Sequence, residues 1–547
     1  MHESTRRSWQ TVSLDVKRLV TVLRVILKFA LSPVLRKLLR LPSADATPAE
    51  RLRLGIEELG LTYLKFGQYL ATRFDILPED VYRQLSRLFE NATPLSYDEV
   101  KSVVEVELHR PIGKIFAFFD PLPIASASVA QVHEARSHSG ERLAVKIQRP
   151  GIERIFMADV RNLRRLAALA DAMGLLGKIS ARELINEFSK WTLRELDFRI
   201  EGHTAEALRR TATPNEIVPR IEWELTTARV LTMEFLGGVS LAKIADLVDA
   251  GKIEEVHALL PHMQFVEASR NLVIASLHQL FVTGLFHGDP HPGNILIRDD
   301  NTVGFIDFGI FGELTDYERE MLTGHVENIA FGNVDESFRY YRKFLFPSDD
   351  TDLKNFEIEG KSVLRRLYQG MQNPSAPIRD RHLGRYWGEM FGVIRRNRLR
   401  MSTDTLLFWR ALNTLDSSAV RLSAVFDLWA ELQRFFQRFR PPLTERLLRL
   451  LSSEGLAQNA HSLAYSIANY STEFLNDAFR GRLEWLPDIG ESPQLLRRNN
   501  AATKVLAGTI SGISLVVLTI HSSGALVVLS VGATLMLFSL VARELSK

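Results

Sequence analysis

One short segment, residues 287–309, constrains this chain more than any other; it reads HGDPHPGNILIRDDNTVGFIDFG. Asp289 and Asn294 lie five positions apart on a loop that leads into a strand, and Asp307 opens the Asp-Phe-Gly that ends the next strand. Phosphoryl transfer needs a carboxylate near the attacking oxygen and oxygen ligands for a magnesium ion that bridges nucleotide phosphates. One hairpin supplies that set here, so the segment predicts a phosphoryl-transfer site rather than a turn with structural carboxylates.

A nucleotide site also needs a cation for the phosphates, and Lys146 meets that need. It lies in Ala-Val-Lys-Ile on a predicted strand, which matches the Val-Ala-Ile-Lys pattern of kinases. Another predicted strand, residues 229–235, is similar to the hinge between kinase lobes. We therefore expect Glu234 and Leu236 to lie beside the adenine.

The loop expected to cover the phosphates departs from the kinase pattern. No Gly-x-Gly-x-x-Gly precedes Lys146, and residues 123–132 read PIASASVAQV instead. Alanine in place of glycine restricts the backbone conformations that can wrap phosphates. No Ala-Pro-Glu follows Gly309 either. These absences disfavour a conventional protein kinase.

The pattern along the chain predicts an α+β fold. Residues 48–118 and 151–210 read as mainly helical, whereas residues 122–149 alternate like strands. A long helical stretch is predicted up to Thr283, and helices resume over residues 315–480. The arginine-rich helix near residues 394–400 is expected to present a solvated face.

The C-terminal end predicts membrane insertion. Residues 505–520 and 525–542 are uncharged spans of 16 and 18 residues, joined by a four-residue turn. Each span is short for a bilayer of about 30 Å, but the pair with its turn predicts a transmembrane helical hairpin, and basic residues on both flanks place both ends in the cytoplasm. A buried soluble hairpin is the alternative. Residues 483–504 read as the linker that precedes it.

Charge and composition narrow the partners. The first forty residues carry nine Lys/Arg against two acidic residues, so residues 1–45 are a basic amphipathic segment that either lies on an anionic membrane or packs on its own domain. The net charge of +3 is too small to argue for nucleic acid, and the absence of cysteine excludes cysteine-ligated zinc and iron–sulfur clusters. Gly508 and Gly512 permit close helix approach and are the feature that points to a homodimer.

Taken together, five motifs resemble the UbiB/AarF family of atypical protein-kinase-like proteins. They are the alanine-rich loop, AVKIQRPG, ELDF, HGDPHPGN and FIDFG, and LTYLKFGQYLATRFDILP adds that family's Lys-x-Gly-Gln signature at Lys65 to Gln68. The resemblance covers roughly residues 50–320. It implies a two-lobed kinase-like fold with a helical extension over the active-site cleft. The implied divisions are a helical extension at 46–120, an N-lobe at 121–236, a C-lobe at 237–345 and its helical remainder at 346–482.

The resemblance also implies a role for each matching residue. Lys65 would reach into the cleft and pair with Glu195, while Lys146 would contact nucleotide phosphates with Glu201 as its helix partner. Asp289 would be the catalytic carboxylate, and Asn294 and Asp307 would hold Mg²⁺. The remaining implied positions are the phosphate loop at Ala125, Ser126, Ala127 and Ser128 and the supporting residues Gly67, Gln68 and Asp197.

The function implied is that of an ATP-binding protein whose ATPase activity responds to membrane lipids and supports ubiquinone biosynthesis. Its expected location is the bacterial inner membrane, with the kinase-like domain in the cytoplasm. Its expected partners are membrane lipids, quinone precursors and quinone-biosynthesis enzymes. Two alternatives stay open: a non-catalytic membrane scaffold that binds nucleotide, and a small-molecule or lipid kinase of the aminoglycoside-phosphotransferase type.

Overall fold

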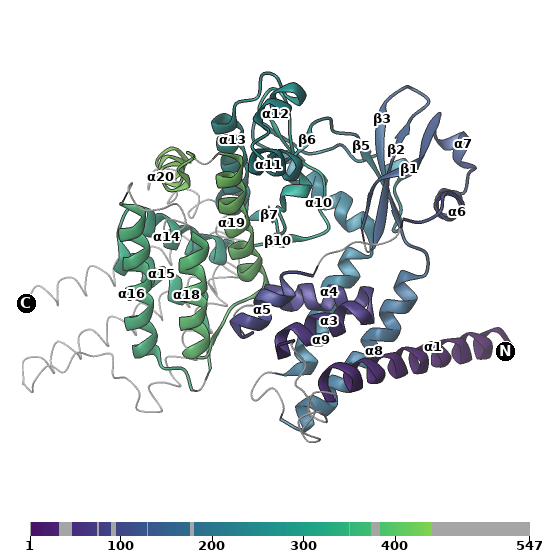
Figure 1. Ribbon diagram of the computed structural model, residues 1–547, viewed down its shortest axis with the longest axis horizontal. Helices are drawn as coiled ribbons and strands as arrows, with labels where there is room; N and C mark the ends of the chain where they lie inside the picture. Colours follow the sequence, from purple (N-terminus) through teal and green to yellow (C-terminus); the bar gives the residue numbers. More distant parts are fainter. Residues whose placement is uncertain are drawn as a thin grey trace, which may run out of the picture. The chain divides into compact units, whose positions relative to one another are not determined.

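The computed structural model describes residues 2–31, 46–73, 76–88, 94–127, 129–174, 180–348, 350–373, 383–423 and 425–439 (Figure 1). These ranges contain no helix that is both long enough and apolar enough to cross a membrane. The predicted linker at 483–504 and hairpin at 505–542 lie outside the described residues, as does Ser128. All described elements belong to one unit, Met1–Arg440.

The N-terminal part of the unit is helical, as the sequence predicts. The helices are α1 (His2–Ile26), which continues as a π-helix over Leu27–Leu31, α3 (Pro48–Leu59), α4 (Leu61–Thr72), α5 (Glu79–Leu85), α6 (Tyr97–Leu108) and α7 (Ile112–Ile115). Helices α3 and α6 begin at capping side chains, Thr47 and Ser96, which accept hydrogen bonds from backbone N–H groups of the first turn. Helices α1 and α3–α5 share a hydrophobic core with the next two helices, α8 and α9.

Helix α1 lies along α8 and is fixed there by two reciprocal ion pairs. Arg18 on α1 binds Asp159 on α8 at 2.7 Å, and Arg161 on α8 binds Asp15 on α1 at 2.6 Å. Val22 and Val25 are buried beside these pairs. This face of the basic segment therefore packs on its own domain, while Val16 and Val20 on the remaining surface are exposed.

A four-stranded antiparallel sheet follows, in the order β1-β2-β3-β5. Its strands are β1 (Phe118–Ser126), β2 (Ala130–Arg136), β3 (Arg142–Gln148) and β5 (Val230–Glu234). Strand β1 begins at Phe118, four residues before the predicted strand region, because Phe118 pairs with Arg136 at the end of β2. Three helices are inserted before β5: α8 (Ile152–Ala172), α9 (Ala181–Glu195) and α10 (Phe198–Thr211).

The predicted helical stretch up to Thr283 is divided into α11 (Leu241–Asp249), α12 (Ile253–Leu259), α13 (Phe265–Leu277) and a π-helix, His278–Thr283. A positive φ of 73° at Gly251 separates the first two, a conformation that glycine adopts without steric cost. A second four-stranded sheet has the order β4-β9-β8-β6. Its strands are β4 (Glu216–Ile217), β6 (Val239–Ser240), β8 (Ile295–Ile297) and β9 (Val303–Phe305), and β7 (Leu285–His287) pairs separately with β10 (Phe311–Glu313).

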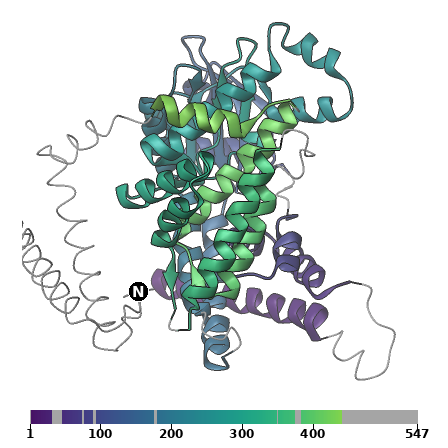
Figure 2. The same cartoon turned by 90° about the vertical axis from the view of Figure 1, so that its left-hand side faces the viewer.

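The remaining described chain is again mainly helical. It comprises α14 (Asp316–Ala330), α15 (Val334–Tyr341), α16 (Leu353–Met371), α18 (Leu383–Arg396), α19 (Thr403–Leu422) and α20 (Leu428–Phe439), with a two-residue strand pair, β11 (Phe346–Pro347) and β12 (Leu399–Arg400). In Figure 2 these green helices face the viewer. They enclose a core of large aromatic side chains that includes Trp409, Phe435 and Phe436.

Candidate active site

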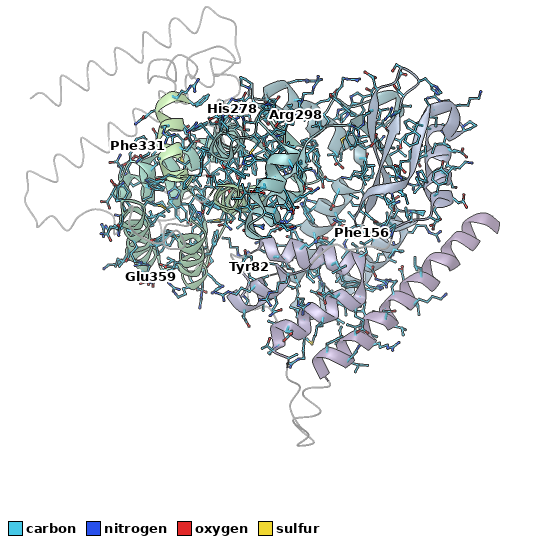
Figure 3. The ribbon with its side chains drawn as sticks, turned by 45° about the horizontal axis from the view of Figure 1, so that its top comes forward. Tyr82, Phe156, His278, Arg298, Phe331 and Glu359 are labelled. Carbon is cyan, nitrogen blue, oxygen red and sulfur yellow. The ribbon has the colours of Figure 1, made fainter. Side chains whose placement is uncertain are left out.

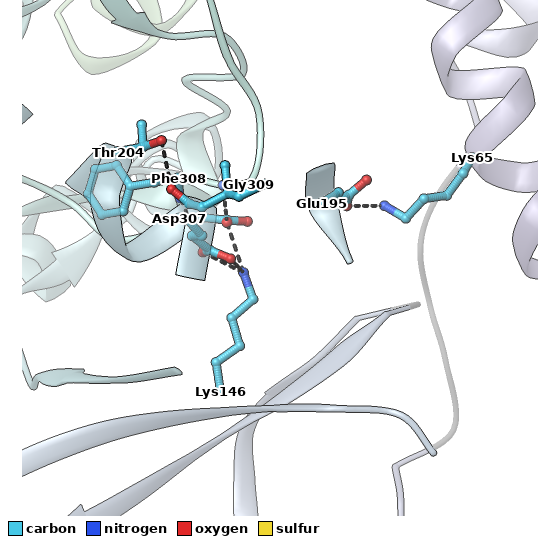
Figure 4. A network of polar contacts seen from close by, with 9 residues as sticks. Lys65, Lys146, Glu195, Thr204, Asp307, Phe308 and Gly309 are labelled. Carbon is cyan, nitrogen blue, oxygen red and sulfur yellow. Dashed lines mark hydrogen bonds and ion pairs between the residues drawn. The ribbon is translucent and has the colours of Figure 1, made fainter. Parts of the chain in front are cut away.

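Lys146 is the central cation of the site. Strand β3 places it opposite Val132 and Leu231, on the two strands that flank β3. Its ammonium group donates to Glu201 Oε1 at 2.7 Å and to Asp307 Oδ1 at 3.0 Å (Figure 4). The structure therefore joins a strand, a helix and the Asp-Phe-Gly segment at one lysine.

Glu201 is held in place from its own helix and from the chain after Asp307. Helix α10 begins at Asp197, whose carboxylate accepts from the backbone N–H of Arg199, so Glu201 lies on the first turns of that helix. The backbone N–H of Phe308 donates to Glu201 Oε1 at 3.3 Å. The Glu201 side chain is only 4% exposed, which leaves the ammonium group of Lys146 as the positive charge that compensates it.

Burial and neighbouring charges shift the pKa values of Lys146, Glu201 and Asp307 in opposite directions. Burial raises the pKa of Glu201 to about 7, although the Lys146 ammonium group opposes that shift. Burial would also raise the pKa of Asp307, but the attraction of Lys146 and hydrogen bonds outweigh it, and the pKa of Asp307 lies below its ordinary value. For Lys146, burial lowers the pKa but the two carboxylates raise it further, so the net shift is upward. Lys146 is accordingly charged at neutral pH.

The loop between β7 and β8 presents Asp289 and Asn294. The backbone N–H of Asp289 donates to His287 Nδ1 at 3.1 Å. Asn294 donates its own N–H to the His291 carbonyl at 2.8 Å and accepts from the N–H of Ile306 at 3.1 Å. These bonds tie the catalytic segment to the strand that leads to Asp307.

Arg410 is a site residue that the sequence interpretation missed. It lies on α19, and its Nη2 is 2.9 Å from Asp289 Oδ1. No local motif marks it, because it lies far along the chain from Asp289 on an ordinary helix.

Lys65 reaches the site from the N-terminal helices. It lies on α4, its side chain is 5% exposed, and it forms a short ion pair with Glu195 at the end of α9 (Figure 4). Gly67 does not face the cleft; it packs toward Leu88 and Ile56, where a methyl group would lie 2.4 Å from Leu88 Cδ1. The Lys-x-Gly-Gln segment thus uses its lysine for the site and its glycine for packing.

Both lysines, their carboxylate partners, Asp289, Asn294 and Arg410 border one cleft of about 1430 Å³. The predicted residues that line it are Lys65, Gln68, Ala125, Ala127, Lys146, Glu195, Glu201, Glu234, Leu236, Asp289, Asn294 and Asp307. Ser126 and Asp197 are not among the lining residues. The Ser126 hydroxyl instead accepts a hydrogen bond from Arg149 at 2.9 Å, and Asp197 pairs with Arg199 at 2.6 Å.

The donor set fits a magnesium–nucleotide complex better than a metal ion bound by protein alone. Within the described ranges, no group of three His, Asp or Glu side chains could hold a metal ion. Asn294 and Asp307 nevertheless both offer oxygen atoms to the cleft. Magnesium is commonly bound by one or two carboxylates together with substrate phosphates, so these two residues would hold Mg²⁺ when ATP is bound.

Comparisons with known proteins agree with this geometry. Residues 87–340 match the family model described as the ABC1 atypical kinase-like domain. A "Probable protein kinase UbiB" of Marinobacter nauticus is 30% identical over 407 residues, which cover 72% of this chain and 71% of the relative. The chain belongs to the ABC1/UbiB family of atypical kinase-like proteins. A "Probable protein kinase UbiB" of Pseudomonas aeruginosa is 29% identical over 458 residues, which cover 78% of this chain and 81% of the relative.

Membership of the ABC1/UbiB family establishes the kinase-like fold and implies ATP binding and ATP-dependent phosphoryl transfer to an acceptor that the family name does not identify. The matched residues include Lys146, Asp289 and Asp307, whereas Lys65 and Arg410 lie outside them. A solved structure, described as the complex of Rv3197 with erythromycin from Mycobacterium tuberculosis, has a TM-score of 0.48 and 23% identity. It covers 70% of this chain and 93% of that one.

Proposed function

We propose that this protein is a membrane-associated ATPase of the atypical kinase type that supports ubiquinone, or another isoprenoid quinone, biosynthesis. The observation that carries the proposal is the convergence of Lys146, Glu201 and Asp307 on a cleft that also contains Asp289 and Asn294. Relatives named "Probable protein kinase UbiB" support the class of chemistry. The presence of all five groups at one cleft argues against a degenerate, inactive site.

Each residue would have a defined task. Lys146 would bind phosphate oxygens, and Asn294 and Asp307 would hold a magnesium ion, which would supply charge neutralisation at the phosphates. Asp289 accepts a proton from the attacking hydroxyl or water. Arg410, at 2.9 Å, fixes the orientation of the Asp289 carboxylate.

The N-terminal helices disfavour a protein acceptor. The ion pair of Lys65 and Glu195 occupies part of the cleft, and Lys65 adds positive charge near the phosphates. Water or a small amphiphile therefore fits the site better than a folded peptide segment. We propose that nucleotide binding shifts helices α4 and α5, and that this exposes a surface for quinone precursors and for the enzymes that modify them.

The proposed location is the bacterial inner membrane, held by the uncharged spans near the C-terminus, with the kinase-like domain in the cytoplasm. Membrane lipids would then be the immediate partners. If purified protein with lipid shows no ATP-dependent change in hydrogen exchange over residues 55–90, the proposed movement of α4 and α5 is wrong.

The test of the enzymatic proposal is ATP hydrolysis by the full chain in liposomes of anionic lipid. Asp307→Asn should lower the rate about 100-fold or more, because it removes the carboxylate that would hold the magnesium ion against the phosphates. Asp335→Asn is the matched control, since Asp335 is exposed and pairs with Lys361 away from the cleft. Hydrolysis that survives in Asp307→Asn would place the activity elsewhere.

A non-catalytic, nucleotide-binding scaffold is the second candidate. The observation that favours it is the ion pairing of Asp289 and of Glu195, because each carboxylate is already occupied by a cation. Tight binding of a fluorescent ATP analogue without hydrolysis in any lipid mixture would support this candidate over the ATPase.

A further inference from the structure

The cleft is larger than one nucleotide requires. Small-molecule sites commonly enclose roughly 300–1,000 Å³, whereas this cleft encloses about 1430 Å³. Its lining continues past Asp289 and Arg410 to α5 and α18. We call this part the helical compartment; it is lined by Tyr82 and Leu85 of α5 and by Trp387, Gly388, Phe391 and Arg395 of α18.

The two walls of the helical compartment touch each other. Arg395 on α18 donates a hydrogen bond to the carbonyl of Leu77, just before α5, at 2.5 Å. Figure 3 shows Tyr82 where the N-terminal helices meet the C-terminal helices, with Glu359 farther out on α16. The compartment is therefore enclosed by secondary structure from both ends of the described chain.

The surface of the compartment suits a flat apolar body. A Cβ atom added at Gly388 would meet no other atom within 4 Å, so the backbone of α18 borders open space there. Trp387 lies beside it and contacts Trp409, with ring centroids 3.9 Å apart and the ring planes tilted by 39°. Neither indole N–H has a hydrogen-bond partner among the described residues. Aromatic walls favour offset stacking with a planar ring.

The charge of the compartment suits an anion. Its charged lining residues are Arg83, Arg395, Arg396, Arg410 and Glu389. Arg396 pairs with Glu359 and Glu389 pairs with Arg366, both on α16. The described contact of Arg395 is to a carbonyl, which leaves its positive charge uncompensated there. Within the arginine-rich segment 394–400, for which the sequence predicts a solvated face, Arg395 is half-buried and lines the cleft.

We infer that the helical compartment binds a planar aromatic molecule that carries an anionic group, beside the nucleotide site. The aromatic walls would contact the ring, and Arg395 would bind the anionic group. The compartment adjoins Asp289 through Arg410, so the bound molecule lies where a phosphate acceptor or an effector would lie. The role of the bound molecule as phosphate acceptor or effector rests on the proposed function, whereas its binding to the compartment does not.

The test uses 2-naphthoate and its uncharged counterpart 2-naphthamide as probes, with the full chain and ligand-observed NMR. Gly388→Leu extends a side chain from a position where an added Cβ meets no atom within 4 Å, and it should weaken both probes at least about tenfold. Gly113→Leu is the matched control, because Gly113 also has open space around it but does not line the cleft. Arg395→Gln should weaken naphthoate about fivefold and leave naphthamide unchanged.

Binding of a fluorescent ATP analogue to the same preparations separates this inference from the proposed function. Gly388→Leu should retain nucleotide affinity, which also shows that the variant is folded. Equal naphthoate binding by wild type and Gly388→Leu, or no binding by wild type, would overturn the inference that the helical compartment is a binding site. Naphthoate binding that depends on Gly388 in a protein without ATPase activity would overturn only the proposed function.

Discussion

Two regions of the molecule each bring one lysine to the same cleft, by different means. The sheet region places Lys146 on a central strand between two carboxylates, Glu201 and Asp307. The N-terminal helices place Lys65 on α4, where it pairs with Glu195 on α9. Lys146 belongs to the kinase-like core, whereas Lys65 is delivered by helices that pack against it from outside.

The two ion pairs differ in burial, and this difference suggests different roles for the two lysines. Glu201 is almost fully buried, and the ammonium group of Lys146 compensates its charge. Removal of that ammonium group should therefore lower the stability of the folded protein strongly. Glu195 is more exposed, with 16% of its side-chain surface accessible. The core lysine should therefore matter more for stability, and the N-terminal lysine more for access to the cleft.

The largest expected effect contrasts the two lysines directly. Lys146→Met should lower the free energy of unfolding by about 3–5 kcal/mol, because it leaves Glu201 buried without a compensating cation. Lys65→Met should lower it by about 1–3 kcal/mol, since Glu195 retains some contact with water. Urea unfolding monitored by tryptophan fluorescence measures both. Equal losses of unfolding free energy in the two variants would contradict the proposed difference between the two lysines.

The next effect concerns the packing of the N-terminal helices alone. Gly67→Ala places a methyl group 2.4 Å from Leu88 Cδ1 and 3.2 Å from Ile56 Cγ2, which should cost about 1–3 kcal/mol of unfolding free energy. Gly113→Ala is the control and should be neutral or slightly stabilising, because nothing lies within 4 Å. If Gly67→Ala also abolishes nucleotide binding, then the packing of the N-terminal helices and the nucleotide site of the kinase-like core depend on each other.

A pH effect should come from the core. The pKa of Glu201 is raised from 4.5 to about 7 by burial, so the folded protein keeps a proton that the unfolded chain has already lost. Its contribution to stability is present at pH 4.5 and is lost as the pH rises through 7. Relative to Glu201→Gln, the wild type should lose about 2 kcal/mol of unfolding free energy over this interval. If the unfolding free energies of wild type and Glu201→Gln changed with pH in parallel, Glu201 would not be the source of the pH effect.

The smallest effect should be on turnover. Lys65→Ala removes a cation that fills part of the cleft, and ATP hydrolysis in liposomes should rise about two- to fivefold, which corresponds to less than about 1 kcal/mol. Lys252→Ala is the control, because Lys252 is exposed and its ion pair within the described ranges is with Glu255, three residues away. A loss of hydrolysis in Lys65→Ala would make Lys65 a catalytic group instead of a controlling one.

Much of the core could be predicted because its residues are adjacent in sequence or occur in recognisable motifs. The strand around Lys146 is a short, mainly apolar segment that pairs with β2 in an unbroken register, and the segment from Asp289 to Asp307 contains one continuous hairpin. Both lysine–carboxylate pairs that the family resemblance implied are present in the structure. Their roles in turnover stay predictions.

Other parts of the site depend on tertiary packing that no local pattern encodes. Arg410 meets Asp289 only because α19 packs beside the catalytic loop, and its own helix shows nothing unusual in sequence. Arg395 meets Leu77 across more than three hundred positions of chain. The split of the helical stretch before Thr283 was also missed, because a single glycine at a turn weakens a helical pattern only slightly.

The ion pairs between α1 and α8 also specify a direction. Each helix contributes one acidic and one basic side chain, with Asp15 opposite Arg161 and Arg18 opposite Asp159. If α1 lay on α8 in the reverse orientation, Asp15 would face Asp159 and Arg18 would face Arg161, and like charges would repel at both contacts. Two residues on each helix thus discriminate between two polarities that the apolar contacts of Val22 and Val25 alone would not distinguish, and the N-terminus of the chain is assigned to one end of α8.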